Sequence, residues 1–140
     1  MAEQFVDSAT LPGVIPYLTI TGGRGSQAVD FYTRAFGGRE VMRMPADDGK
    51  LLLHARLVIN GAVVMLSDDF PQSPHHMGSK APIGTVVHLQ VDDADKWYSR
   101  AVEAGASVSM AIGDQFWGDR YGQLTDPFGH AWSIGSTLKK

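Results

Sequence analysis

The sequence contains no cysteine, so disulfide bonds and thiolate chemistry are excluded, as is usual in a reducing compartment. It has no apolar run of about 18 residues, and no membrane-spanning helix is expected. Lysine and arginine are not clustered and the formal net charge is −3, so no footprint for a nucleic acid is visible. The N-terminus lacks the pattern of a signal peptide. We therefore expect a cytoplasmic protein that binds neither nucleic acid nor membrane.

What is present indicates a small globular protein that is rich in strands. The 140 residues suffice for one compact domain or for two small modules that share a core. The hydrophobic content of 44% and the charged content of 19% are ordinary for globular proteins. The 16 glycines predict many turns, and hence many short strands.

The first half of the chain has the pattern strand, helix, strand, strand, strand. Strands are expected at residues 14–20, 39–44, 51–59 and 62–67, and a helix at residues 26–36, where apolar residues recur at helical spacing. Ser26 is predicted to cap this helix, and Gly37 and Gly38 to end it. Asn60 and Gly61 predict a two-residue hairpin turn between the last two strands.

The same order of elements returns in the second half. Strands are expected at residues 85–91 and 107–112 and in the closing hairpin 116–134, with a helix that begins at Asp92 or Asp93 and ends at Gly105. The helix motif Ala28-x-x-Phe31-Tyr32-Thr33-Arg34-Ala35 matches Ala94-x-x-Trp97-Tyr98-Ser99-Arg100-Ala101. Gly61 likewise matches Gly129 in the closing hairpin. A repeat in element order, helix motif and turn predicts two βαβββ modules.

Two such modules predict an α+β fold in which a curved, half-open mixed β-sheet barrel carries its helices outside. The open concave face would form a cavity suited to a small molecule. The expected divisions are an N-terminal arm at residues 1–12, a first module at 13–67, a linker or flap at 68–83 and a second module at 84–137.

Residues 13–137 resemble the vicinal oxygen chelate superfamily, which includes glyoxalase I, extradiol dioxygenases and bleomycin-resistance proteins. The resemblance rests on the motifs Asp30-Phe31-Tyr32, His54-Ala55-x-Leu57, Met65-Leu66-Ser67-Asp68, Trp117-Gly118-Asp119-Arg120-Tyr121-Gly122 and Asp126-Pro127-Phe128-Gly129-His130-x-Trp132. The fuller set is similar to the PhnB-like (3-demethylubiquinone methyltransferase-like) branch. The resemblance implies a homodimer that binds a small molecule.

Metal enzymes of this superfamily place His or Glu at four cavity-facing strand positions. The resemblance puts these positions at Pro16, Met65, Val86 and Ser133. None of these side chains is a competent ligand for a first-row divalent metal. The sequence therefore predicts neither a bound metal nor another cofactor at this site.

Two histidines are candidates for a ligand site. His88 lies two residues after Val86 and is expected on the same face, where it could accept a ligand hydrogen bond or act as a general base. The alternative is a histidine satisfied by a neighbouring strand. His54 could join it across the sheet as a non-standard metal pair. The adjacent His75 and His76 are expected to be solvated in a loop.

The closing hairpin supplies further candidates. Trp117 could stack on a planar ligand, and Arg120 could hold a carboxylate or phosphate in bidentate fashion. The alternative is that Asp119 and Arg120 organise the loop by local pairing. Tyr121, Gln90 and Gln123 complete the predicted ligand-binding set as residues that line the cavity.

These residues leave three functions open. The first is a protein of the bleomycin-resistance type that binds an apolar or aromatic small molecule without a metal. The second is a divalent-metal-dependent lyase, isomerase or dioxygenase with a relocated site at His54 and His88. The third is a structural or regulatory module whose cavity binds nothing.

Overall fold

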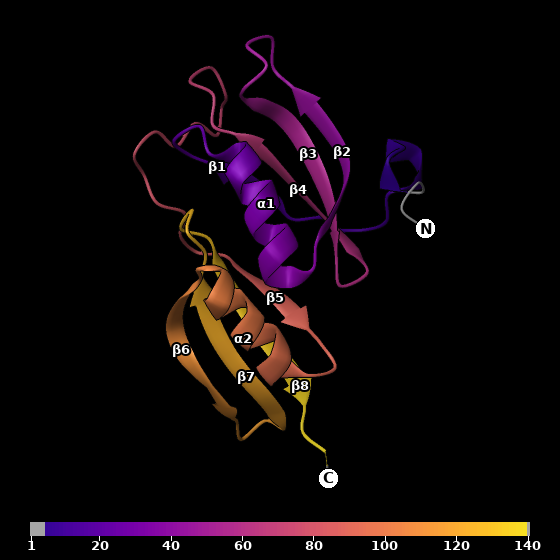
Figure 1. Cartoon of the computed structure of the whole chain (residues 1–140), viewed down its shortest axis with the longest axis vertical. Helices are drawn as coiled ribbons and strands as arrows, with labels where there is room; N and C mark the ends of the chain where they lie inside the picture. Colours follow the sequence, from indigo (N-terminus) through magenta and orange to yellow (C-terminus); the bar gives the residue numbers. More distant parts are fainter. Residues whose placement is uncertain (1–4, 140) are drawn as a thin grey trace. The chain divides into compact units, whose positions relative to one another are not determined.

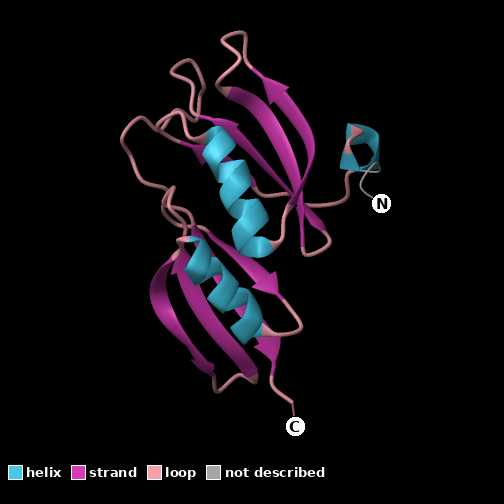
Figure 2. Ribbon diagram, viewed as in Figure 1, coloured by secondary structure: helices cyan, strands magenta, loops and turns pink. Residues whose placement is uncertain are grey.

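The computed structural model describes residues 5–139, so residues 1–4 of the predicted N-terminal arm and Lys140 lie outside it. The described part contains two α-helices and eight strands, after a short 3-10 helix at Ser8–Thr10 (Figures 1 and 2). The elements are β1 Tyr17–Ile20, α1 Gly25–Phe36, β2 Arg39–Pro45, β3 Leu52–Ile59, β4 Ala62–Asp68, β5 Val86–Gln90, α2 Ala94–Ala104, β6 Ser107–Asp114, β7 Asp119–Thr125 and β8 Ala131–Thr137.

The predicted α+β fold with two tandem βαβββ modules is confirmed. The first sheet has the order β1-β4-β3-β2 and the second has the order β5-β8-β7-β6. In each sheet the first and last strands of the module pair in parallel, while the other pairs are antiparallel. Both sheets are therefore mixed, and each is open rather than closed into a barrel. In each module a helix covers one face of the sheet (Figure 2).

Contacts divide the chain into two compact units. Of the described residues, the first contains 5–33 and 37–81, and the second contains 34–36 and 82–139. Within residues 5–139, no helix has the length and apolar character needed to cross a membrane.

Helix α1 buries one face and begins in a way that differs from the prediction. Phe31, Tyr32 and Ala35 are at most 2% exposed, which accounts for their helical spacing in the sequence. Gly37 ends the helix with a left-handed φ of 64°. The prediction that Ser26 caps α1 is wrong, because the helix begins at Gly25.

A buried carboxylate takes the place of a local cap on α1. Asp68, at the end of β4, accepts hydrogen bonds from the backbone N–H of Gly25 at 2.8 Å and of Leu52 at 2.7 Å. In the second module, Ser136 at the end of β8 accepts from the N–H of Ala94 at 3.2 Å. The repeat thus extends to the residue that ties the last strand to the start of the helix.

Both predicted hairpin turns form. Asn60 and Gly61 both have positive φ, at 50° and 82°, as a two-residue turn between antiparallel strands requires. In the closing hairpin, the buried Asp126 carboxylate accepts from the N–H groups of Phe128 and His130, each at 2.9 Å. It also accepts from the indole Nε1–H of the fully buried Trp132 at 2.9 Å.

Candidate functional site

Strand register decides which side chains share the open face of each sheet. In β1, Leu18 and Ile20 are buried, whereas Tyr17 is 53% exposed and lies on the opposite face. Tyr17 pairs with Met65 across the parallel β1–β4 ladder. The position assigned to Pro16 is therefore wrong by one residue, and a slip of one residue changes the face of a strand.

The second module gives the matching result. Ser133 pairs with His88, while Val86 pairs with Ala131, although Val86 and His88 share a face. Met65 and Ser133 are the equivalent positions on the last strands of the two modules. Met65 pairs with Tyr17, and Ser133 pairs with His88, so His88 rather than Val86 is the counterpart of Tyr17. The register therefore replaces Pro16 by Tyr17 and Val86 by His88 in the predicted set of four positions, and His88 brings an imidazole into that set.

The corrected set does not fit a divalent metal ion. Tyr17, Met65, His88 and Ser133 supply a single imidazole and no carboxylate, whereas metal sites of this type need several imidazole or carboxylate ligands. Among residues 5–139, no group of three or more His, Asp or Glu side chains is placed to hold a metal ion.

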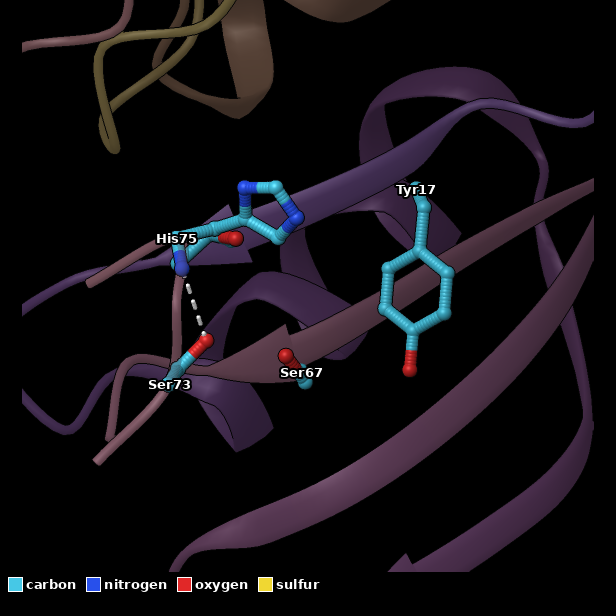
Figure 3. Close-up of a pocket in the computed structure, with 5 residues that line it drawn as sticks. Tyr17, Ser67, Ser73 and His75 are labelled. Atoms are coloured by element: carbon cyan, nitrogen blue, oxygen red, sulfur yellow. Dashed lines mark hydrogen bonds between the residues drawn. The ribbon is translucent and has the colours of Figure 1, made fainter. Parts of the chain in front are cut away.

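The first module contains an open pocket of about 550 Å³. Its lining is Tyr17 and Thr19 of β1, Ser67 of β4, and Ser73 and His75 of the loop that follows (Figure 3). Within this loop, the His75 backbone N–H donates to Ser73 Oγ at 3.1 Å. Among residues 5–139, the lining thus combines two ring side chains with three aliphatic hydroxyl groups.

A chain of hydrogen bonds links Tyr17 to His54 and Arg56 of β3. The Tyr17 hydroxyl oxygen lies 2.6 Å from His54 Nδ1, and Arg56 Nε donates to His54 Nε2 at 2.9 Å. His54 and Arg56 are two residues apart on β3, so their side chains lie on the same face of the strand. Both ring nitrogens of His54 are therefore engaged within the first module.

Arg56 is a buried cation that holds the N-terminal segment. It is 6% exposed and donates to the carbonyl oxygens of Phe5 and Val6 and to Ser8 Oγ. In the part of the chain that the structure describes, these acceptors and His54 are all neutral groups. The sequence gives no sign of these contacts, because about 50 residues separate the partners.

The surroundings of this chain shift two pKa values. Burial, with a further contribution from the Arg56 charge, lowers the pKa of His54 below its ordinary value of 6.5. Burial raises the pKa of Tyr17 above 10.0, and the Arg56 charge only partly opposes this shift. At neutral pH, His54 is therefore neutral and Tyr17 keeps its hydroxyl proton.

The lowered pKa of His54 predicts a pH dependence of stability. Below pH 6.5 the unfolded chain protonates His54 before the folded chain does, so the free energy of unfolding falls as the pH falls. We expect the free energy of unfolding of the wild type, taken relative to that of His54→Gln, which does not titrate, to fall between pH 7.5 and pH 5. Urea unfolding at several pH values measures this, and a constant difference between the two proteins would contradict it.

Four of the predicted site residues gather on the open face of the second sheet. His88 Nδ1 lies 2.7 Å from Ser133 Oγ and His88 Nε2 lies 2.8 Å from Gln90 Oε1. The His88 and Tyr121 rings stack with centroids 5.9 Å apart, and Gln123 donates to the Tyr121 hydroxyl at 3.0 Å. Their assignment to ligand binding stays a prediction.

Gly135 of β8 makes this stacking possible. A Cβ there would lie 3.2 Å from His88 Cε1, and 3.4 Å from both Gln90 Oε1 and Tyr121 Cδ1. The glycine thus leaves room for three neighbouring side chains to cover the middle strand.

Trp117 and Arg120 differ in their surroundings. The Trp117 ring contacts Tyr121 edge-on with centroids 5.3 Å apart, and its Nε1–H donates to Asp119 Oδ2 at 3.1 Å. Arg120 pairs with Asp95 of α2 and Asp114 of β6, each at 2.8 Å. Two carboxylates already occupy the Arg120 guanidinium, so its predicted role in holding a ligand anion would require displacement of one of them.

The structure does not bring His54 and His88 into one sheet. His54 lies on β3 of the first sheet and His88 lies on β5 of the second, so the expectation that they join across a sheet is wrong. The other pair of histidines also divides. His75 lines the pocket, while His76 Nδ1 lies 3.0 Å from Asp69 Oδ2.

Asp69 organises the loop that carries His75. Its carboxylate accepts from the N–H groups of Gly78 and Met77 at 2.8 and 3.1 Å. Removal from water acts to raise the pKa of Asp69, but these N–H groups and His76 outweigh it and lower the pKa below 3.8. The Asp69 carboxylate is therefore charged at neutral pH and bonded to the loop at Met77 and Gly78.

Sequence reasoning missed most of the pocket. Tyr17, Thr19 and Ser67 were not among its candidates, although alternation along β1 and β4 places all three opposite the buried Leu18 and Leu66. This alternation can be read from the sequence. No sequence pattern placed the loop residue His75 beside these strands.

Comparison with known proteins gives one family. The family model of the Glyoxalase/Bleomycin resistance protein/Dioxygenase superfamily matches residues 14–134. Protein Rv0887c of Mycobacterium tuberculosis is 44% identical over 136 residues, which cover 92% of this chain and 76% of the relative. Among solved structures, PA1353 of Pseudomonas aeruginosa has a TM-score of 0.74 at 30% identity, covering 91% of this chain and 99% of that one. A PhnB protein of Bacillus cereus has a TM-score of 0.70 at 18% identity, covering 90% and 100%, and shares the fold. The chain belongs to the Glyoxalase/Bleomycin resistance protein/Dioxygenase superfamily.

Proposed function

We propose that this chain binds a small aromatic molecule without a metal ion, in the pocket of the first module. The lining of this pocket carries the proposal: two ring side chains can contact a planar ligand, and three hydroxyl groups can bond its polar atoms. The volume of about 550 Å³ lies within the range of pockets that hold small organic ligands.

The donor sets support binding without a metal. The register pairs at the family's ligand positions contain one imidazole, His88, whose two nitrogens already face Ser133 and Gln90. A relocated metal site at His54 and His88 has less support. His54 Nε2 accepts from the Arg56 guanidinium, and a metal there would have to displace this bond beside a buried cation.

A pocket-filling variant tests the location of the site. We expect a panel of aromatic compounds to raise the melting temperature of the wild type, and Ser67→Phe to abolish this shift because its ring fills the pocket. Ser107→Phe places the same ring on an exposed strand position of the second module and should leave the shift intact. Differential scanning fluorimetry measures all three proteins.

Two outcomes of this experiment would contradict the proposal. One is a panel that shifts none of the proteins. The other is a shift that Ser67→Phe retains in full, because the ligand would then bind elsewhere. Ser73→Trp blocks the same pocket from the loop and replaces Ser67→Phe if that variant does not fold.

A further inference from the structure

The hydrogen bonds around His54 determine whether Tyr17 donates or accepts in its bond to His54. Arg56 Nε–H can only donate, so His54 Nε2 must accept and carries no hydrogen. A neutral imidazole then carries its hydrogen on Nδ1. That Nδ1–H faces the Tyr17 oxygen at 2.6 Å, so the tyrosine oxygen is the acceptor of this bond.

The other protonation states of His54 conflict with Arg56. The Nε2–H tautomer and the imidazolium would each set one N–H group against another, and the imidazolium would add a second cation beside a buried one. The lowered pKa of His54 agrees with the neutral form.

The Tyr17 hydroxyl therefore has a hydrogen to donate. Within residues 5–139, the hydroxyl bonds to His54, which occupies a lone pair of the oxygen and not its hydrogen. Tyr17 lines the pocket, and its ring lies across from His75, with Ser67 of β4 between and below the two rings and the Tyr17 hydroxyl directed away from His75 (Figure 3). The raised pKa of Tyr17 keeps this donor protonated at neutral pH.

The donors in this chain of hydrogen bonds all point the same way, from Arg56 toward Tyr17. Arg56 donates to His54 and His54 donates to Tyr17, so each bond polarises the next one away from the buried cation. A donor at the end of such a chain favours an acceptor that carries negative charge. The acid of the pocket loop, Asp69, is bonded to the N–H groups of Met77 and Gly78 and lies beside His76, whereas the Tyr17 hydroxyl bonds to His54.

We propose that the Tyr17 hydroxyl donates a hydrogen bond to a carboxylate or phenolate oxygen of the bound aromatic molecule. His54 and Arg56 act as positioning residues that fix the direction of this donor. The inference rests on the proposed function, because it assigns the ligand chemistry of the same pocket. Bonds from Arg56 to Phe5, Val6 and Ser8 hold its guanidinium so that Nε faces His54.

The tautomer of His54 can be measured without any ligand. Long-range ¹H–¹⁵N correlation spectra of the full chain at pH 7.5 should show a protonated Nδ1 and an unprotonated Nε2. A protonated Nε2, in either the other tautomer or the imidazolium, would overturn the inference and leave the proposed function untouched.

Binding of two simple probes tests the role of the hydroxyl. Benzoate presents a carboxylate and toluene presents only the ring, and shifts of the Tyr17, Thr19 and Ser67 resonances report binding of each. We expect Tyr17→Phe, which removes only the hydroxyl, to weaken benzoate about tenfold, the effect of losing one hydrogen bond to a charged group. Toluene affinity should stay unchanged.

Two variants of His54 provide the matched control. A glutamine can accept from Arg56 through Oε1 and donate to Tyr17 through Nε2, so His54→Gln should keep benzoate affinity. His54→Leu cannot do either and should weaken benzoate alone, about as much as Tyr17→Phe. A merely structural role for His54 would weaken both probes together.

The possible failures separate the two proposals. If toluene and benzoate bind but Tyr17→Phe leaves benzoate unchanged, the inference is wrong and the proposed function stands. If neither probe shifts the pocket resonances of the wild type, the proposed function fails and the inference fails with it.

Discussion

Asp126→Ala should lower the free energy of unfolding by about 4 kcal/mol, the largest effect we expect from a single substitution in this chain. The Asp126 carboxylate is 4% exposed and accepts from two backbone N–H groups and from the Trp132 indole. Alanine leaves these donors without the acceptor in a buried turn, and each such donor costs about 1–3 kcal/mol. Urea unfolding followed by circular dichroism measures the change.

Two matched variants identify the cause. Asp126→Asn keeps Oδ1 as an acceptor and should lose less stability than Asp126→Ala. Asp47→Ala removes an exposed carboxylate and should change stability by no more than about 0.5 kcal/mol. A loss below about 1 kcal/mol for Asp126→Ala would show that the turn does not depend on this carboxylate.

Asp68→Ala should lower the free energy of unfolding by about 3 kcal/mol. Asp68 is 2% exposed and is the acceptor for the N–H groups of Gly25 and Leu52. Its loss therefore leaves two buried donors unpaired and detaches the start of α1 from the end of β4. The same urea unfolding experiment measures the loss.

The repeat supplies the control for this prediction. Ser136 holds the start of α2 through one hydroxyl bond to Ala94, at 3.2 Å. Ser136→Ala should therefore cost only about 1 kcal/mol, the typical contribution of one neutral hydrogen bond. Equal losses for the two variants would contradict the idea that the first module relies on a buried carboxylate where the second uses a hydroxyl.

Features fixed by neighbouring residues could be predicted from the sequence. The helix motifs repeat because the same positions are buried in both modules, as for Tyr32 and Tyr98. Asn60 and Gly61 form a hairpin turn through their own backbone preferences, and Asp93 caps α2 through the N–H of Lys96. The order of the elements and the family both follow from such local signals.

Features fixed by distant residues could not be predicted. The sequence predicts Ser26 as the cap of α1, but the Gly25 N–H at the start of the helix donates to Asp68, 43 residues away. The direction of the Tyr17 hydroxyl depends on His54, 37 residues away, and through it on Arg56. The error at Pro16 has a similar origin, since one residue of register decides the face of a strand.

The candidate site also contains residues that the sequence could predict and residues that it could not. The sequence singles out His88, Gln90, Tyr121 and Gln123 separately, and the structure brings them together on one face of the second sheet. The pocket of the first module draws instead on a loop, whose position depends on the bonds of Asp69 to Met77 and Gly78. Spacing in the sequence carries no information on those bonds.

The central claim, binding at the Tyr17 pocket without a metal, can be tested on one preparation purified without a chelator. Elemental analysis gives the zinc, nickel, iron and manganese content per chain, and benzoate titration of the same sample is then repeated after dialysis against EDTA. The account predicts far less than one equivalent of metal and an unchanged benzoate affinity. About one equivalent of any of these metals, lost on dialysis together with benzoate binding, would contradict it.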